Sequence, residues 1–345
     1  MLEHGGNLQD AIARFGRPRE AWLDLSTGIN PHGYPTPNLN ADAWHRLPER
    51  DPILVRAAED YYNAPGALPV AGTQAAIQAL PRLRAHSGAG SRVIVAAPTY
   101  AEHAHQWAMA GHAVREISYE QLDDAVAGCD VMIVCNPNNP TGATVTPQRL
   151  LAWADRLALR GGWLVVDEAF GDVTPALSVA AHASQPGLIV LRSVGKFFGL
   201  AGLRLGFVAA HPALLAALAD MLGPWAVSSP VQQIGTAALN NRTWQIAMRS
   251  RLEAEGERLC LLLDSHGLHP SGCALYQWCA QETAADATRL SHHLAQRGIW
   301  VRLFTNAACG VRFGLPPHAT GWQQLAQALS AYSISLSDNA LESRS

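Results

Sequence analysis

Five short apolar segments restrict the fold that this chain can adopt. They are residues 91–98, 130–137, 162–169, 188–193 and 204–210, and helical stretches alternate with them. Each is almost continuously apolar, which is typical of strands covered on both faces of a parallel sheet. The alternation of strands with helices predicts an α/β fold built on a mostly parallel sheet.

Two helices can be placed within this pattern. One begins after Gly72 and Thr73 and carries apolar residues on one face. The other covers 147–160, where Thr146 can cap the N-terminus and Pro147 suits the first helical position.

The regular alternation of apolar segments with helices ends after about Pro230. A long helical stretch ends near Gly267, a typical helix C-cap, and short strands and helices follow. This pattern predicts a second, smaller α+β domain. We expect an N-terminal arm at 1–40 that packs with the small domain, a large domain at 41–228, a small domain at 229–333 and a polar tail at 334–345.

Composition excludes several classes of protein. The 345 residues are 48% hydrophobic and 15% charged, with a net charge of -3, so a packed core is expected and a basic nucleic-acid-binding face is not. The sequence has no apolar run of membrane-spanning length, and it begins without a secretory signal pattern. The six cysteines and 14 histidines lack metal-ligand spacing. We expect a cytoplasmic protein with no metal, no nucleic-acid partner and no membrane partner.

Lysine is almost absent from this chain. Lysine and arginine together number 25, and 24 of these are arginines, which leaves Lys196 alone. A lysine amine can act as a nucleophile, whereas arginine keeps its proton. Ser193 and Arg204 flank Lys196 and could hold a phosphate.

A P-loop is excluded because Val190 and Phe197 stand where glycine and Ser/Thr are required. An S-x-x-K β-lactamase site is excluded because there is no second lysine for K-T-G.

Three further motifs lie at the ends of the expected strands or at a helix start. Residues 136–142 read NPNNPTG, Asp167 ends the strand at 162–169, and Gly72-Thr73 opens a helix whose free amides favour a phosphate. Taken singly, these could be a turn, a helix cap and an ordinary loop. Together with Lys196 they provide an amine for a Schiff base, a carboxylate for a pyridinium nitrogen and phosphate ligands, which indicates pyridoxal 5'-phosphate. No G-x-G-x-x-G motif follows a strand, which disfavours a dinucleotide.

The chain resembles the fold-type I pyridoxal-phosphate enzymes of the class I/II aminotransferase family. The resemblance runs from His4 to about Arg312. It is carried by HGGN (4–7), LDLSTGINPHGYP (23–35), PVAGTQAAIQALPRL (69–83), APTYAEH (97–103) and VDEAF (166–170). The first two motifs favour the branch of the family that decarboxylates L-threonine O-3-phosphate. That reaction gives (R)-1-amino-2-propanol O-2-phosphate for cobalamin biosynthesis.

The resemblance assigns roles to individual residues. Lys196 corresponds to the Schiff-base lysine, Asp167 to the partner of the pyridine nitrogen, Asn139 to the partner of the phenolic oxygen and Tyr100 to the ring that stacks on the cofactor. The implied cofactor-binding residues are Gly72, Thr73, Gln74, Tyr100, Asn139, Asp167, Ser193, Lys196 and Arg204. The implied substrate-binding residues are His4, Gly5, Gly28, Asn139, Arg302 and Arg312.

Two positions depart from the family pattern. Many aminotransferases carry a tyrosine three residues after the aspartate, where this chain has Phe170. Relatives also often carry a tyrosine that reaches the neighbouring subunit's cofactor phosphate, where this chain has Leu47-Pro48-Glu49. A homodimer is still expected, but no residue of this chain is assigned to that cross-subunit contact.

Two other functions stay open. A histidinol-phosphate-type aminotransferase uses the same cofactor groups, and spacing does not separate amino transfer from decarboxylation. A binding module without turnover could also keep the fold.

Overall fold

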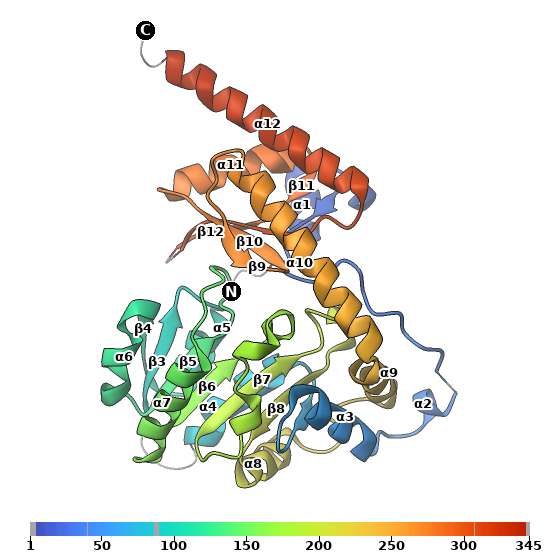
Figure 1. Ribbon diagram of the computed structural model, residues 1–345, viewed down its shortest axis with the longest axis vertical. Coiled ribbons are helices and arrows are strands. Elements are labelled where there is room, and N and C mark those ends of the chain that lie inside the picture. The colour runs from blue at the N-terminus through green and yellow to red at the C-terminus, as the bar shows by residue number, and fades with distance from the viewer. Residues whose placement is uncertain (1–4, 40, 86–89, 307, 343–345) are drawn as a thin grey trace. The chain divides into compact units, whose positions relative to one another are not determined.

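The computed structural model describes residues 5–39, 41–85, 90–306 and 308–342. Backbone contacts divide the chain into two compact units, both drawn in Figure 1. Unit 1 comprises Met1–His32, Pro140–Gly142 and Ser250–Ser345, and unit 2 comprises Gly33–Asn139 and Ala143–Arg249. The domain boundaries expected at residues 40, 228 and 333 stay predictions.

A seven-stranded sheet forms the centre of unit 2. Its order is β2-β8-β7-β6-β5-β3-β4. Strands β4, β3, β5, β6 and β7 run parallel, and β8 runs antiparallel to both of its neighbours. The strands are β2 (Leu68–Val70), β3 (Arg92–Ala97), β4 (Ala113–Ser118), β5 (Val131–Cys135), β6 (Trp163–Asp167), β7 (Leu188–Ser193) and β8 (Gly206–Ala210). The expected mostly parallel α/β sheet is confirmed.

The five apolar segments become β3, β5, β6, β7 and β8. The sequence pattern predicts neither β2 nor β4, and it does not predict that β8 reverses direction. Strand β8 pairs with β7 along its whole length, from Ile189 opposite Ala210 to Ser193 opposite Gly206. Residues 204 and 205 precede the strand, so Arg204 lies in the connection between β7 and β8.

Helices cover the sheet of unit 2 (Figure 1). In α7, the Thr146 hydroxyl accepts a bond from Arg149 N at 3.5 Å and Pro147 is the first helical residue, as predicted; the helix ends at Ala158. The helices of this unit are α2 (Asp42–His45), α3 (Pro52–Tyr62), α4 (Thr73–Ala85), α5 (Glu102–Met109), α6 (Leu122–Ala125), α7 (Pro147–Ala158), α8 (Pro212–Leu222) and α9 (Ser229–Asn240).

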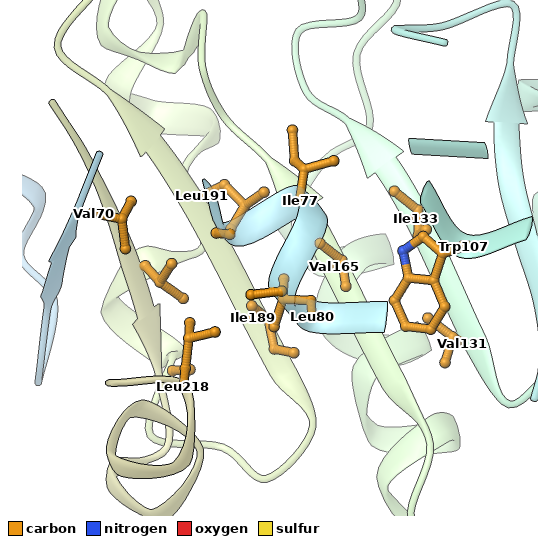
Figure 2. Close-up of a cluster of buried hydrophobic side chains, with 14 of the residues drawn as sticks. Val70, Ile77, Leu80, Trp107, Val131, Ile133, Val165, Ile189, Leu191 and Leu218 are labelled. Atoms are coloured by element: carbon orange, nitrogen blue, oxygen red, sulfur yellow. The ribbon is translucent and has the colours of Figure 1, made fainter. Parts of the chain in front are cut away.

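The main core lies between the sheet and α4. Figure 2 shows Ile77 and Leu80 of α4 next to Val165 and Ile189 of the central strands. The alternate residues of the same strands, such as Leu164, face the other side and are also buried. Burial on both faces explains the continuous apolar runs, and it fixes the positions of the strand ends.

Unit 1 is a small α+β unit. Strands β1 (Leu23–Asp24) and β11 (Ile299–Trp300) pair in parallel. An antiparallel sheet has the order β12-β13-β10-β9, with bounds Arg302–Thr305, Cys309–Gly314, Tyr276–Ala280 and Ser271–Cys273. Its helices are α1 (Leu8–Phe15), most of α10 (Arg242–Asp264), α11 (Ala284–Gln296) and α12 (Ala319–Glu342).

The helical stretch expected after Pro230 consists of two helices, α9 and α10. Asn241 separates them, and its side chain accepts a hydrogen bond from Trp244 N at 3.1 Å, as a helix cap does. Near the C-terminus, α12 continues to Glu342, so the segment expected as a polar tail is helical from residue 334 to residue 342. Across the part of the chain that the structure describes, no helix has the length and apolar character needed to cross a membrane.

Candidate active site

A cavity in unit 2 lies where β5, β6 and β7 end. Cys135, Asp167 and Ser193 are the last residues of these parallel strands, and all three line it. The nine residues predicted to bind the cofactor also line it together: Gly72, Thr73, Gln74, Tyr100, Asn139, Asp167, Ser193, Lys196 and Arg204. The other lining residues are Cys135, Pro137, Ala169, Phe170, Gly195, Ala201 and Leu205. Residues more than 130 positions apart are therefore gathered into one site.

Asp167 is buried at the floor of this cavity and has a buried histidine as its partner. Its Oδ2 atom lies 2.9 Å from Nε2 of His103, and its Oδ1 atom accepts a bond from Ala169 N at 3.0 Å. Burial alone would lower the pKa of His103, but its interactions with Cys135 and Asp167 outweigh burial and raise the pKa to about 10. The imidazole is therefore protonated at neutral pH, and it pairs with the side chain of Asp167.

The sequence pattern predicts no role for His103. The signal available is spacing, because His103, the second residue of α5, lies three residues after Tyr100 and its backbone nitrogen donates to Tyr100 O at 3.1 Å. The ligand atoms of His103, Cys135 and Asp167 lie within 4.8 Å of one another. His103 thus connects the ends of two strands behind the cavity floor.

Replacing His103 with phenylalanine should remove one pH-dependent contribution to stability. The folded pKa of about 10 lies above the ordinary value of 6.5, so protonation favours the folded chain. This contribution is complete below pH 6.5 and is lost as the pH rises through about 10. In urea unfolding of the cofactor-free wild type, the free energy of unfolding should fall between pH 6.5 and about 10. In the variant this fall should be less steep.

His103→Gln is the control for this prediction. Glutamine can still donate a hydrogen bond but does not titrate, so its pH slope should match that of the phenylalanine variant. Equal slopes in the wild type and both variants would contradict a raised pKa for His103.

Lys196 reaches the same cavity from the segment after β7. Its Nζ atom lies 5.4 Å from the centre of the Phe170 ring, and the side chain is half-buried. The Ser193 hydroxyl accepts a bond from Gly195 N at 3.2 Å, which fixes the turn leading to the lysine. The amine therefore shares a cavity with Asp167 and Asn139 and does not extend into bulk solvent.

One end of the cavity is shaped for an anion. A Cβ atom on Gly72 would lie 2.6 Å from Nη2 of Arg204, and one on Gly206 would lie 2.7 Å from the backbone nitrogen of Thr73. Gly72 also has a φ of +71°, which glycine adopts readily. Because α4 begins at Thr73, free helix amides meet a guanidinium and the nearby Ser193 at this end. This combination suits a phosphate dianion.

The loop that carries Asn139 is held by its own side chains. Asn136 donates to Val145 O at 3.1 Å and accepts from Val145 N at 2.9 Å, so it closes the base of the NPNNPTG loop. Asn138 accepts a bond from the Thr99 hydroxyl at 2.8 Å. The position of Asn139 is thereby fixed by hydrogen bonds on either side of the loop.

Tyr100 lies on the wall of the cavity. Its hydroxyl donates to Gln74 Oε1 at 3.2 Å, and Gln74 in turn donates to Glu102 at 2.8 Å. Burial raises the pKa of Tyr100 to about 12, so the phenol stays neutral. The ring is held by its hydroxyl at the edge of the cavity, as a stacking residue requires.

Apart from Asn139, which lies in unit 2, the described residues expected to bind substrate belong to unit 1. Arg302 and Arg312 are directly opposite each other on β12 and β13. Arg312 is buried and donates to Ser26 O at 2.7 Å. Burial lowers its pKa to about 10, which leaves the guanidinium charged at neutral pH. Two cationic groups on neighbouring strands form an electropositive site.

Gly5 of the N-terminal segment lies beside Arg312. A Cβ atom on Gly5 would lie 2.4 Å from Ser26 O and 3.5 Å from Nη2 of Arg312, so only glycine fits there. Gly28 is buried in the segment that follows Ser26. His4 lies outside the described residues. The structure thus brings Gly5 and Arg312 together within unit 1.

Comparison with known proteins gives consistent results. The family described as aminotransferase class I and II matches residues 36–322. The threonine-phosphate decarboxylase of Pseudomonas aeruginosa is 50% identical over 96% of this chain and 98% of its own length, and that of Sinorhizobium sp. is 46% identical over 95% and 98%. The structure of histidinol-phosphate aminotransferase from Sinorhizobium meliloti in complex with pyridoxal-5'-phosphate superposes with a TM-score of 0.80 at 20% identity, covering 97% of this chain and 96% of that one.

The family match covers more than half of the chain, and the two decarboxylases match it over nearly its full length. The resemblance stated from the sequence motifs is therefore confirmed. This chain belongs to the class I and II aminotransferase family.

Proposed function

We propose that this protein is a pyridoxal-phosphate-dependent decarboxylase. It converts L-threonine O-3-phosphate to (R)-1-amino-2-propanol O-2-phosphate and carbon dioxide, for the aminopropanol arm of cobalamin biosynthesis. The observation that carries the proposal is the single cavity that holds Lys196, Asp167, Asn139 and an anion-binding end. The names of the two relatives at 50% and 46% identity support the substrate.

The residues of the cavity fit pyridoxal 5'-phosphate. Gly72 and Thr73 at the start of α4, together with Ser193 and Arg204, supply cationic and polar donors at one end of the cavity, which suits its phosphate. Asp167, held by its contact with His103, suits a protonated ring nitrogen. The lone lysine supplies the amine that an aldehyde requires. Each polar group of the cofactor therefore has a matching group in the cavity.

The cofactor and the residues of the chain contribute different parts of the chemistry. When bound, pyridoxal phosphate supplies an aldehyde carbon for the substrate amine and a ring that accepts the electron pair of a broken Cα bond. Asp167 would keep the ring nitrogen protonated, which favours acceptance of that pair. Asn139 would donate to the ring oxygen, and Tyr100 would cover the ring face. Phe170 supplies no hydroxyl for that oxygen, unlike the tyrosine of many aminotransferases.

Lys196 would have two tasks. Its amine would hold the cofactor in the absence of substrate, and as a free amine it would be placed to return a proton to the substrate Cα. A positioned general acid contributes about 10²–10⁴-fold to such a step. The half-buried position of Nζ next to Phe170 keeps the amine within the cavity for this transfer.

We propose that Arg302 and Arg312 bind the two acid groups of the substrate, its phosphate and its carboxylate. A dianionic substrate requires two cations, and the cross-strand pair supplies them. Gly5, Gly28 and His4 would contact the substrate through the N-terminal segment. Fixing both anionic ends sets which Cα bond stands perpendicular to the cofactor ring, and alignment of this kind can be worth about 7–11 kcal/mol of barrier.

A substrate test separates this proposal from an aminotransferase. Incubation of the holoenzyme with O-phosphothreonine should release carbon dioxide and the phosphorylated amino alcohol with no 2-oxo acid present. Amino transfer from histidinol phosphate to 2-oxoglutarate, without carbon dioxide release, would instead show the alternative. Cofactor binding with no product from either substrate would show a binding module. Mass spectrometry of the products distinguishes all three.

We further propose that the protein acts as a cytoplasmic homodimer. The six cysteines are free thiols, which suits a reducing compartment. A groove in unit 2 is lined largely by apolar residues, among them Leu47 and Trp225, which are 66% and 60% exposed. Exposed apolar patches of this kind mark interaction surfaces, and a second copy of the chain would cover this one.

Charge placed in the groove should break the dimer. Leu47→Glu together with Trp225→Glu should sediment as a monomer where the wild type sediments as a dimer, because an interface core disfavours charged residues. The double variant Leu159→Glu/Met109→Glu, at exposed apolar sites that do not line the groove, is the matched control. A monomeric wild type, or a dimeric groove variant, would refute this interface.

A further inference from the structure

A network of buried ion pairs lies beside the candidate active site. Nη1 of Arg192 donates to Glu168 Oε2 at 2.5 Å, and its Nη2 donates to Asp172 Oδ1 at 2.7 Å. The three side chains are at most 3% exposed. They are distinct from the residues that line the cavity, and the chemistry proposed above does not use them.

The network is closely packed on its outer sides. Glu168 also accepts bonds from the Ser178 hydroxyl at 2.5 Å and from Val179 N at 2.8 Å. A Cβ atom on Gly171 would lie 2.7 Å from Nη1 of Arg192, so the backbone approaches the guanidinium directly. The positions of Glu168 and Arg192 are therefore tightly restricted.

The chain connects this network to two residues of the cavity. Glu168 directly follows Asp167, and Arg192 directly precedes Ser193. Glu168 N also donates to Leu191 O at 2.9 Å across the two strands. Because side chains alternate along a strand, Arg192 points to the face opposite Ser193, and the Glu168–Arg192 pair joins the ends of β6 and β7 from behind.

Arg249 extends the network toward Lys196. Its Nε atom donates to Asp172 O at 2.8 Å, and its Nη2 atom donates to the Tyr61 hydroxyl at 3.0 Å. Its guanidinium carbon lies 5.2 Å from the ring centre of Phe197, the residue that follows Lys196. The network therefore contains two guanidiniums and two carboxylates. Two of its members, Glu168 and Arg192, are next to Asp167 and Ser193 in the chain, and a third, Arg249, contacts the residue that follows Lys196.

Stability alone does not account for these charges. A buried ion pair loses hydration that its mutual attraction often fails to recover, and apolar replacements of similar volume are frequently neutral or stabilising. What directional, paired charges do supply is a fixed geometry. A displacement of about 1 Å at a catalytic group can lower a rate about 10²-fold, so fixed strand ends have a functional value.

We propose that Glu168, Asp172, Arg192 and Arg249 are positioning residues that set the places of Asp167, Ser193 and Lys196. The inference rests on the proposed function, because it assigns these three residues to the cofactor. If the inference is right, a variant that lacks these ion pairs but still folds should have more mobile ends of β6 and β7.

A charge-free variant tests the inference. Glu168→Gln, Asp172→Asn and Arg192→Met are combined, so that no carboxylate or guanidinium of the trio is left unpaired. In the cofactor-free protein we expect faster amide hydrogen exchange at 166–170 and 191–197, with a melting temperature close to that of the wild type. The dissociation constant of pyridoxal phosphate should rise at least about 10-fold, and kcat of the loaded enzyme should fall by about 10²-fold with little change in KM.

Arg92→Met is the matched control, because it breaks the exposed Arg92–Asp130 ion pair in the same unit. It should leave all four measurements unchanged. A folded triple variant with wild-type exchange and cofactor affinity would overturn the inference. If the triple variant does not fold, Glu168→Gln decides the question on the same measurements. A wild-type protein that binds no pyridoxal phosphate would instead refute the proposed function.

Discussion

Lys196→Ala should give a colourless protein that has lost decarboxylase activity. The wild type should purify with the visible absorbance of bound pyridoxal phosphate, because an amine lies in the same cavity as Asp167 and the anion-binding end. Alanine provides no amine for the cofactor aldehyde and no acid to return a proton. Loss of the proton transfer alone lowers kcat by about 10²–10⁴-fold. An absorbance spectrum and a product assay measure both effects.

The composition of the chain makes this prediction unusually easy to verify. Lys196 is the only lysine among 345 residues. Borohydride treatment of the wild type should attach the cofactor to a single side chain, which peptide mass spectrometry can identify. Lys196→Arg is the control, since it keeps a positive charge but does not condense with an aldehyde. A yellow Lys196→Ala protein, or a label elsewhere, would contradict the assignment.

Asp167→Asn should lower kcat by about 10²–10³-fold, which is the typical cost of removing one preorganised electrostatic contact. Asparagine keeps the shape of the side chain but cannot hold a proton on the ring nitrogen. It also leaves the buried His103 without its anionic partner at 2.9 Å. The pKa of that imidazole should therefore fall from about 10, which proton NMR of the ring can follow across pH.

Asp130→Asn is the control for this variant. Asp130 is also an ion-paired carboxylate, but its partner is the exposed Arg92. We expect no loss of kcat there. A wild-type rate in Asp167→Asn, or an unchanged titration of His103, would show that the carboxylate does not act on the cofactor ring.

The reactive groups could be predicted because their residue types stand out in the sequence. A lone lysine, an aspartate after an apolar run and the NPNNPTG motif are distinctive, and parallel strand ends converge by geometry. Buried strands such as β5 and β6 are equally distinctive because both faces are apolar. The fold class and the reactive groups therefore follow from these patterns, whereas the full set of nine cavity residues, with Gln74 and Tyr100, follows from the family resemblance.

Edge strands and helix boundaries carried weaker signals. Strand β2 contains Pro69, which lowers strand propensity, yet the strand lies at the sheet edge where a missing donor is tolerated. Strand β4 includes Arg115 and Glu116 and shows no apolar run. The break at Asn241 depends on one side-chain cap within an otherwise helical pattern.

Polar partners behind the cavity were also difficult to foresee. The role of His103 depends on its distance from Asp167, which is 64 positions away in the sequence. Glu168 and Arg192 read as ordinary charged residues next to functional ones, and only their burial shows that they are paired. Local patterns identify which residues do chemistry, whereas long-range packing determines which residues support them.

The edges of the large sheet also limit how copies of this protein can associate. On one side Pro69 interrupts the row of amide donors, and on the other the exposed charges of Arg115 and Glu116 discourage a neighbouring strand. Intermolecular β-augmentation is thus blocked at both borders, which protects the folded chain against runaway polymerisation. Association of two large sheets therefore has to use side-chain surfaces instead of shared backbone hydrogen bonds.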